Sequence, residues 1–304
     1  MKVSELGETG LIRRIAGRIR TGPAVLRGIG DDCAVLKGSG RMLGLFASDM
    51  LVEGIHFTRR MPAEGIGWKA LAVNVSDVAA MGGSPSQAVI SLGLPRATPV
   101  SFVDRLYRGL RRCAAEYGVD LVGGDTVRAP RVVMDVAILG EVERGRVVYR
   151  SGARPGDLLL VTGRLGGSLR SGRHLSFHPR VREARALTAR AKLHAMMDLS
   201  DGLGPDLVKL CEASRVSAVL ESARVPRHRG VSLEQALNDG EDFELLIAAA
   251  PAQAEKLLHW AKRNLRCGLR RVGAIVPRKG RTAVTLVTPR GVRTRKSLAG
   301  FRHF

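Results

Sequence analysis

Short acidic turns recur along this chain of 304 residues. In each of them aspartate or glutamate stands close to glycine or serine, as in GIGDDC (28–33), ASDM (47–50), NVSDVAAMGG (74–83), LVGGDT (121–126), MDLSDGL (197–203) and NDGEDFELL (238–246). Carboxylates gathered in one pocket repel one another unless a counter-charge is present. Mg²⁺ supplies that charge and keeps positions open for phosphate oxygens and water. The turns therefore predict a site for Mg-ATP.

A single acidic turn has a simpler interpretation, because its carboxylate can cap a helix or close an Asx-turn. The repetition of the pattern along one chain favours the metal site. The sequence contains no GxxxxGK[ST] loop, HExxH helix, GxSxG elbow or HRD and DFG pair of protein kinases. We therefore expect the acidic turns themselves to carry any nucleotide chemistry.

Apolar runs alternate with segments of helical period, which predicts a mixed α/β fold. We expect strands at 42–48, 86–94, 119–124, 132–142, 157–163, 217–222 and 243–250. Helices are expected over 62–81, from a Thr98 cap with Pro99 in its first turn to Tyr117, and over 203–214. The first of these would carry Asn74 and Asp77 on one face.

The polar segment EVERGRVVYRSGARPGD (141–157) lies between two of these strands and contains glycine and proline. It predicts a division into residues 1–145 and residues 146–304. His174 and His178 have the spacing of a metal-binding pair, but Pro179 and the nearby arginines favour a solvated loop with a structural role.

The composition is that of a globular protein, with 45% hydrophobic and 25% charged residues. The net charge of +21 could indicate a nucleic-acid partner, but the arginines are scattered and aromatic residues make up only 4%. We therefore expect no nucleic-acid partner and interpret the charge as favouring anionic substrates. The cysteines have no ligand spacing, and no run has the length of a signal-peptide core or membrane span, so we expect a cytoplasmic protein.

The motifs together resemble the thiamine-monophosphate kinase family, in the superfamily of aminoimidazole ribonucleotide synthetase and selenophosphate synthetase. The resemblance covers nearly the whole chain through GIGDDCAVL, SDMLVEGIHF, GWKALAVNVSDVAAMGG, LVGGDT, RSGARPGD, VTGRLGGS, MDLSDGL and GEDFELL. It implies a two-domain α/β (α+β) fold, an N-terminal mixed sheet at the interface of a homodimer, and a C-terminal α/β domain. It also implies Mg-dependent phosphoryl transfer from ATP to thiamine monophosphate.

The resemblance also implies roles for individual residues. It places several magnesium ions at Asp32, Ser48, Asp49, Asp77, Asp125, Asp198 and Asp201. ATP would contact Tyr107, Gly124, Asp125, Arg150 and Ser200. The acceptor would contact His56, Glu241 and Phe301. The acceptor phosphate, with a second pKa of about 6, is itself a nucleophile, so we expect neither a general base nor a covalent phospho-enzyme.

The chain departs from the family pattern at three places. Ala47 stands where a hydroxyl residue is usual, Asp239 stands where glycine is usual, and the segment between Gly167 and Met197 is short and rich in arginine. Two alternatives to the kinase remain open. One is another ATP-dependent enzyme resembling aminoimidazole ribonucleotide synthetase or selenophosphate synthetase, and the other is a catalytically inactive basic binding module.

Overall fold

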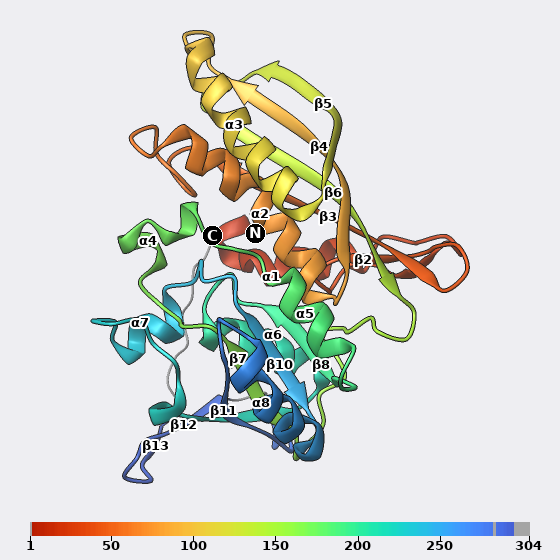
Figure 1. The fold of residues 1–304 in the computed structure, drawn as a ribbon, viewed down its shortest axis with the longest axis vertical. Helices are drawn as coiled ribbons and strands as arrows, with labels where there is room; N and C mark the ends of the chain where they lie inside the picture. The colour runs from red at the N-terminus through yellow and green to blue at the C-terminus, as the bar shows by residue number, and fades with distance from the viewer. Residues whose placement is uncertain (1, 282–283, 295–304) are drawn as a thin grey trace.

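The fold consists of two β-sheets with helices packed around them (Figure 1). The structure is a computed structural model that describes residues 2–281 and 284–294. The first sheet lies in the upper half of Figure 1 and the second in the lower half, with helix α2 (Ala63–Ala80) between them. The predicted α/β fold in two parts is confirmed.

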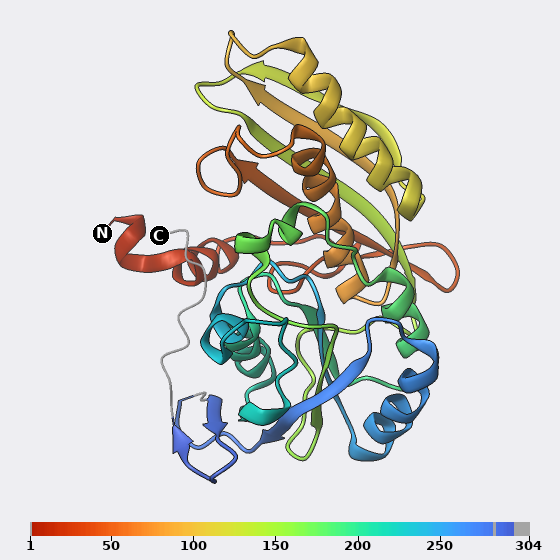
Figure 2. The same cartoon turned by 60° about the vertical axis from the view of Figure 1, so that its left-hand side comes forward.

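The first sheet has the strand order β1-β2-β3-β6-β4-β5. Its strands are β1 (Val25–Arg27), β2 (Ala34–Lys37), β3 (Met42–Val52), β4 (Ser84–Leu94), β5 (Asp120–Arg128) and β6 (Val133–Glu143). Neighbouring strands are antiparallel except β4 and β5, which are parallel and joined through helix α3 (Val100–Tyr117). Figure 2 shows α3 along one face of this sheet.

The second sheet has the order β13-β12-β9-β11-β7-β10-β8. Its strands are β7 (Leu158–Thr162), β8 (Ala195–Asp198), β9 (Ser217–Glu221), β10 (Leu245–Ala249), β11 (Leu269–Val276), β12 (Val284–Val287) and β13 (Arg293–Thr294). The remaining helices are α1 (Val3–Ala16), α4 (Ser168–Ser171), η1 (Arg173–Leu175), α5 (Val181–Thr188), α6 (Leu203–Ser214), η2 (Ser222–Arg224), α7 (Leu233–Asn238) and α8 (Pro251–Asn264).

The apolar core crosses from one half of the chain to the other. One cluster joins the inner face of the first sheet, helices α2 and α3, and one face of the second sheet. A second cluster lies on the other face of the second sheet, beneath α6 and α7. The predicted division at residue 145 falls in the connection from β6 to β7 and stays a prediction.

Helix α2 is the central element of this core. It contacts β3 and β6 of the first sheet and β8 of the second. It is buried almost all round, and its buried side chains include the polar residues Lys69, Asn74 and Ser76. Among the described helices, none combines the length and the apolar character needed to cross a membrane.

The start of α3 differs from the prediction. Thr98 was expected to cap this helix, but the capping residue is Pro99, with extended backbone angles and no side-chain hydrogen bond. Thr98 instead closes a turn in which its N–H donates to the carbonyl of Pro95. The predicted helices over 62–81 and 203–214 are confirmed as α2 and α6, within a residue or two at each end.

Candidate metal and phosphate site

Three aspartates from distant parts of the chain meet where the two halves join. Asp32 lies in the turn before β2, Asp77 in α2, and Asp198 at the end of β8. A carboxylate oxygen of each lies within 4.8 Å of one from each of the others. The site therefore depends on both halves of the chain, and α2 connects them.

The electrostatics of this acidic cluster fit a divalent cation. Burial, together with the surrounding carboxylates, raises the pKa of Asp77 and Asp198 well above the ordinary value. One oxygen each of Asp31 and Asp32 is buried without a hydrogen-bond partner. A bound cation reverses the charge balance of such a site, and an all-oxygen donor set is the one that Mg²⁺ prefers.

Neighbouring polar groups hold the carboxylates in place. The Ser76 hydroxyl donates to Asp198 over 2.6 Å, and the Asp49 N–H donates to the side-chain Oδ1 of Asn74 over 3.1 Å. The Asp49 carboxyl is hydrogen-bonded to Asp77, and burial raises its pKa to about 6. Asn74, Ser76 and Asp77 lie within one turn of α2, so this helix positions much of the site.

Arg150 provides positive charge beside the acidic cluster. Its guanidinium pairs with Asp32, and its backbone N–H donates to Asp31 over 2.8 Å. Although Arg150 and Asp32 were assigned separately to ATP and magnesium, the structure places them in direct contact. This pairing compensates part of the negative charge.

Three other predicted magnesium residues lie apart from the cluster of Asp32, Asp77 and Asp198. The Ser48 hydroxyl donates to Asp135 over 2.8 Å, and Asp201 pairs with Lys209 over 2.5 Å. Asp125 lies on the exposed face of the first sheet, in the cross-strand row of Ser91 and Asp135. Asp49, opposite Val136, points to the other face because side chains alternate along a strand.

The remaining predicted ATP residues occupy different environments. Tyr107 is half-buried in α3 against the main core, and the Ser200 carbonyl accepts the N–H of Glu241 over 2.7 Å. Gly124 in β5 has φ +153°, and a Cβ there would lie 1.8 Å from the carbonyl oxygen of Ile90. Glycine is therefore needed at this position for the strand pairing itself.

The predicted acceptor residues His56 and Glu241 meet at a buried lysine. The Lys69 ammonium lies 2.6 Å from a carboxylate oxygen of Glu241 and donates to the His56 carbonyl over 3.2 Å. The N–H of Val52 donates to His56 Nδ1 over 3.0 Å, which places the proton of a neutral ring on Nε2. The third predicted residue, Phe301, lies outside the described residues.

Sequence reasoning overlooked Lys69 and Ser76, although both carry a recognisable signal. They are polar residues within the apolar helical run GWKALAVNVSDV, and burial of such groups requires a specific partner.

Ala47 and Asp239 are the two single residues that depart from the family pattern. Ala47 lies within β3. Asp239 has ordinary right-handed helical backbone angles, and its carboxylate accepts the Gly167 N–H over 2.9 Å.

The predicted solvated environment of the two histidines was wrong for His174. His174 is 1% exposed in η1, its Nδ1 lies 3.2 Å from the Ser168 carbonyl, and its pKa is lowered by burial and by the charge of Lys69. His178 is exposed and lies 2.9 Å from Glu116. Neither histidine belongs to a potential metal cluster among the described residues.

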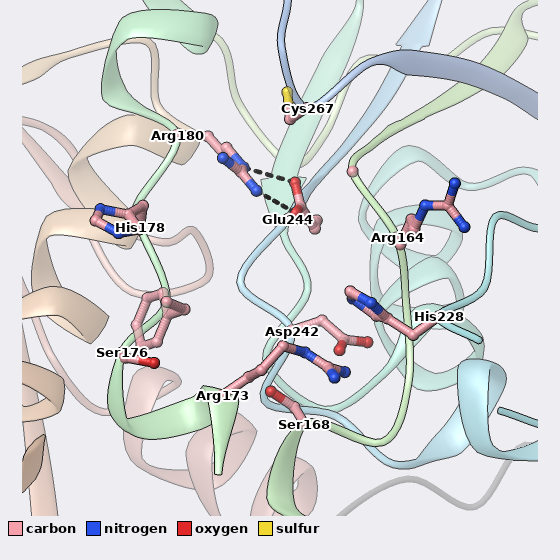
Figure 3. Close-up of a pocket in the computed structure, with 12 residues that line it drawn as sticks. Arg164, Ser168, Arg173, Ser176, His178, Arg180, His228, Asp242, Glu244 and Cys267 are labelled. Carbon is pink, nitrogen blue, oxygen red and sulfur yellow. Dashed lines mark hydrogen bonds and ion pairs between the residues drawn. The ribbon is translucent and has the colours of Figure 1, made fainter. Parts of the chain in front are cut away.

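A cavity of about 370 Å³ lies at the edge of the second sheet where β8 ends in Asp198 (Figure 3). Its lining includes Arg164, Arg173 and Asp242, together with Arg180, which binds Glu244 by two hydrogen bonds. The end of β7, the start of β10 and the end of β8 lie side by side at this edge, so the cavity and Asp198 of the acidic cluster are at the same end of the sheet.

Comparisons with known proteins agree with this architecture. Family models described as AIR synthase related protein, N-terminal and C-terminal domains, match residues 30–142 and 154–285. The thiamine-monophosphate kinase of Rhodopirellula baltica is 36% identical over 295 residues, 90% of each chain. That of Synechococcus elongatus is 37% identical over 286 residues, 84% of this chain and 86% of the relative.

Similarity extends to solved structures. A structure described as AaThiL complexed with AMPPCP and TMP superposes with a TM-score of 0.86 at 32% sequence identity. The match covers 100% of this chain and 99% of that one. The fold described above is therefore shared along its whole length with a protein that was solved with an ATP analogue and TMP.

Proposed function

The chain belongs to the thiamine-monophosphate kinase family of AIR synthase related proteins, and on that premise we propose that it transfers the γ-phosphoryl group of ATP to thiamine monophosphate. The products are thiamine diphosphate and ADP. Within the structure, the observation that supports this reaction is the cluster of Asp32, Asp77 and Asp198. Three carboxylates gathered from both halves of the chain suit a metal-dependent phosphoryl transfer.

Asp32, Asp77 and Asp198 are the residues that would hold Mg²⁺, with Asp49 beside them. When bound, Mg²⁺ neutralises phosphate charge and orients the oxygens of the triphosphate. The Arg150 guanidinium, already at this site, can pair with a phosphate of the nucleotide. Ser76 and Asn74 keep the carboxylate side fixed while the nucleotide binds.

The acceptor is activated by its own charge. An oxygen of the thiamine monophosphate phosphate forms the new bond to the γ-phosphorus while the bond from that phosphorus to the bridging oxygen of ADP breaks. Because a phosphate monoester with a second pKa of about 6 is largely dianionic at neutral pH, no side chain has to remove a proton. The chain's task is to align the two substrates and exclude water.

His56 and Glu241 are the proposed acceptor contacts. With Nδ1 accepting from Val52, the His56 ring can offer its Nε2 proton to a phosphate oxygen. The Glu241 side chain is 19% exposed and carries a charge opposite to that of a thiazolium ring. These two contacts would hold the two ends of the acceptor.

We also propose that the chain forms a homodimer through the outer face of the first sheet. Exposed apolar side chains lie on this face, namely Phe46, Met50, Val89 and Leu139. Phe46 is paired with Leu139 across β3 and β6, so the apolar residues adjoin. Asp125 lies on the same face, and a second copy would cover it.

Since all the cysteines are free thiols, we propose a reducing, cytoplasmic location.

Binding of the acceptor tests the proposal against its alternatives. Calorimetric titration of thiamine monophosphate into protein with Mg²⁺ and a non-hydrolysable ATP analogue should show one saturable site per chain. Thiamine without its phosphate should bind more weakly. Binding of the analogue without any binding of thiamine monophosphate would favour another superfamily enzyme. If neither ligand binds, the inactive basic module is favoured.

A further inference from the structure

We propose that Lys69 is a positioning residue for the acceptor, and that it acts by holding Glu241 and the His56 loop in a fixed relation. This inference rests on the proposed function, because it assigns these two residues to the acceptor. Lys69 itself has no exposed surface, so it cannot be the group that the acceptor touches. Its effect on the acceptor has to pass through its neighbours.

The contacts of Lys69 connect two separate segments. Its ammonium lies 2.6 Å from Glu241 in the loop before β10, and 3.2 Å from the carbonyl of His56 in the loop after β3. One segment belongs to the first half of the chain and the other to the second. A single buried cation thus fixes the separation of two proposed acceptor contacts, just as the cluster of Asp32, Asp77 and Asp198 joins the halves elsewhere.

The Glu241 loop needs such a contact because its backbone is unusual. Glu241 has φ +59° and Phe243 has φ +49°, in the left-handed region that non-glycine residues rarely occupy. Each such residue costs about 1 kcal/mol or more and persists only where its surroundings hold it. The Glu241 N–H donates to the Ser200 carbonyl, Phe243 stacks on Phe177, and Lys69 binds the Glu241 carboxylate.

Helix α2 links this contact to the phosphate site. Lys69 and Asp77 are eight residues apart in α2, a rise of about 12 Å along the axis at 1.5 Å per residue. Residues at this spacing lie on one broad face of a helix. The same rigid element therefore sets the distance between the acceptor contacts and the carboxylates proposed for the metal.

Replacing Lys69 tests this role through a split between the two substrates. In Lys69→Met the KM for thiamine monophosphate should rise at least about tenfold, because the acceptor contacts lose their alignment. The KM for ATP should stay within about twofold, because the acidic cluster keeps its own hydrogen bonds. An equal rise in KM for both substrates, or a wild-type KM for the acceptor, would overturn the inference.

A second variant covers the case in which Lys69→Met folds poorly. Removing both charges in Lys69→Met/Glu241→Gln avoids an uncompensated carboxylate and should restore much of the melting temperature. The KM of the double variant for the acceptor should stay raised. Its fold-increase should be smaller than the product of the fold-increases in Lys69→Met and Glu241→Gln alone, as expected of residues that act as a unit. Fully multiplicative effects would contradict a shared role.

Asp157→Asn is the matched control for the loss of a buried carboxylate contact. Asp157 is 3% exposed, pairs with His194 over 2.8 Å, and precedes β7 at the end of the strand far from the site. Its loss should lower the melting temperature and leave both KM values unchanged. If the wild-type chain makes no thiamine diphosphate, the proposed function fails and this inference fails with it. If it does, an unchanged KM in Lys69→Met overturns this inference alone.

Discussion

Asp77 and Asp198 combine a functional benefit with a cost to folding. Both are raised in pKa by burial and by carboxylate neighbours, so their charged forms oppose folding when no cation is bound. We expect Asp77→Asn and Asp198→Asn to lower kcat at least about 100-fold, because they remove proposed metal ligands at the reacting phosphates. In EDTA the same variants should melt at a higher temperature than the wild type.

Exposed Asp104 in α3 provides the control for this prediction. Asp104→Asn makes the same chemical change away from the site and should alter neither kcat nor melting. Kinetics at saturating and at limiting Mg²⁺ distinguish the outcomes. Near-normal turnover of both site variants at limiting Mg²⁺ would show that the cluster is not the metal site.

Asp242 predicts a dependence of stability on pH. Burial, with a smaller contribution from Glu244, raises its pKa to about 7, although the Gly166 N–H opposes this shift. Because the folded pKa of Asp242 exceeds its unfolded pKa, its contribution to the free energy of unfolding is fully present below the unfolded pKa. That contribution is lost as pH rises through about 7. Asp242→Asn should remove on the order of 2 kcal/mol of the decline between pH 5 and pH 8.

Urea unfolding in EDTA at pH 5, 6, 7 and 8 measures this decline. The asparagine amide can still accept from Gly166, so the loop geometry is retained. Asp120→Asn, an exposed site at the start of β5, should keep the wild-type slope. Parallel slopes for Asp242→Asn and the wild type would show that Asp242 does not titrate in this range.

At the residue scale, sequence patterns find charged groups better than they find the partners of those groups. Asp32, Asp77 and Asp198 were predicted as magnesium ligands because each stands in an acidic motif that resembles the family's. The pairing of Arg150 with Asp32, and of Lys69 with Glu241, joins segments more than a hundred residues apart. Such contacts follow from the docking of the two halves, which no local pattern encodes.

At the scale of elements, α2 and α3 cross at unusually close range through two glycines. A Cβ on Gly109 would lie 1.8 Å from the carbonyl oxygen of Glu64, and one on Gly67 would lie 1.9 Å from that of Leu106. Gly109→Ala should therefore push the helices apart and destabilise the protein by about 3 kcal/mol. Because α2 carries Lys69 and Asp77, the affinity for the acceptor should fall as well.

Thermal and urea unfolding measure this effect, and Gly145→Ala is its control. A Cβ on Gly145 meets nothing within 4 Å, so that variant should unfold like the wild type. An unchanged free energy of unfolding in Gly109→Ala would mean that the two helices can separate without cost.

The predicted elements were those with strong local signals. The central strands β3, β4, β6, β7 and β10 are long apolar runs, and α2 and α6 have capping or glycine signals at their ends. The prediction missed six strands, most of them short and dependent on neighbouring strands for their pairing, namely β1, β2, β8, β11, β12 and β13. It also missed the end of β3, where polar residues such as Asp49 continue the strand because β6 pairs with it throughout.

At the scale of the whole molecule, the outer face of the first sheet predicts a dimer. The molecular mass measured by sedimentation should be about twice the chain mass of 32.7 kDa, since an exposed apolar sheet face favours burial against a second copy. Leu139→Glu places a charge at the centre of this face and should shift the protein towards the monomer. Analytical ultracentrifugation over a range of concentrations measures the shift.

Val100→Glu is the matched control, because Val100 is 74% exposed at the start of α3, away from this face. It should sediment like the wild type. A monomeric wild type at micromolar concentration would contradict the proposed interface. An unchanged dimer in Leu139→Glu would show that a different surface forms it.

The most direct test of the central claim follows the phosphoryl group itself. Purified protein is incubated with Mg²⁺, ATP labelled in the γ-phosphate and thiamine monophosphate, and the products are separated by chromatography alongside a reaction without acceptor. The account predicts that thiamine diphosphate carries the label and forms in equal amount to ADP. Label released as free phosphate, with ADP but no thiamine diphosphate, would contradict it.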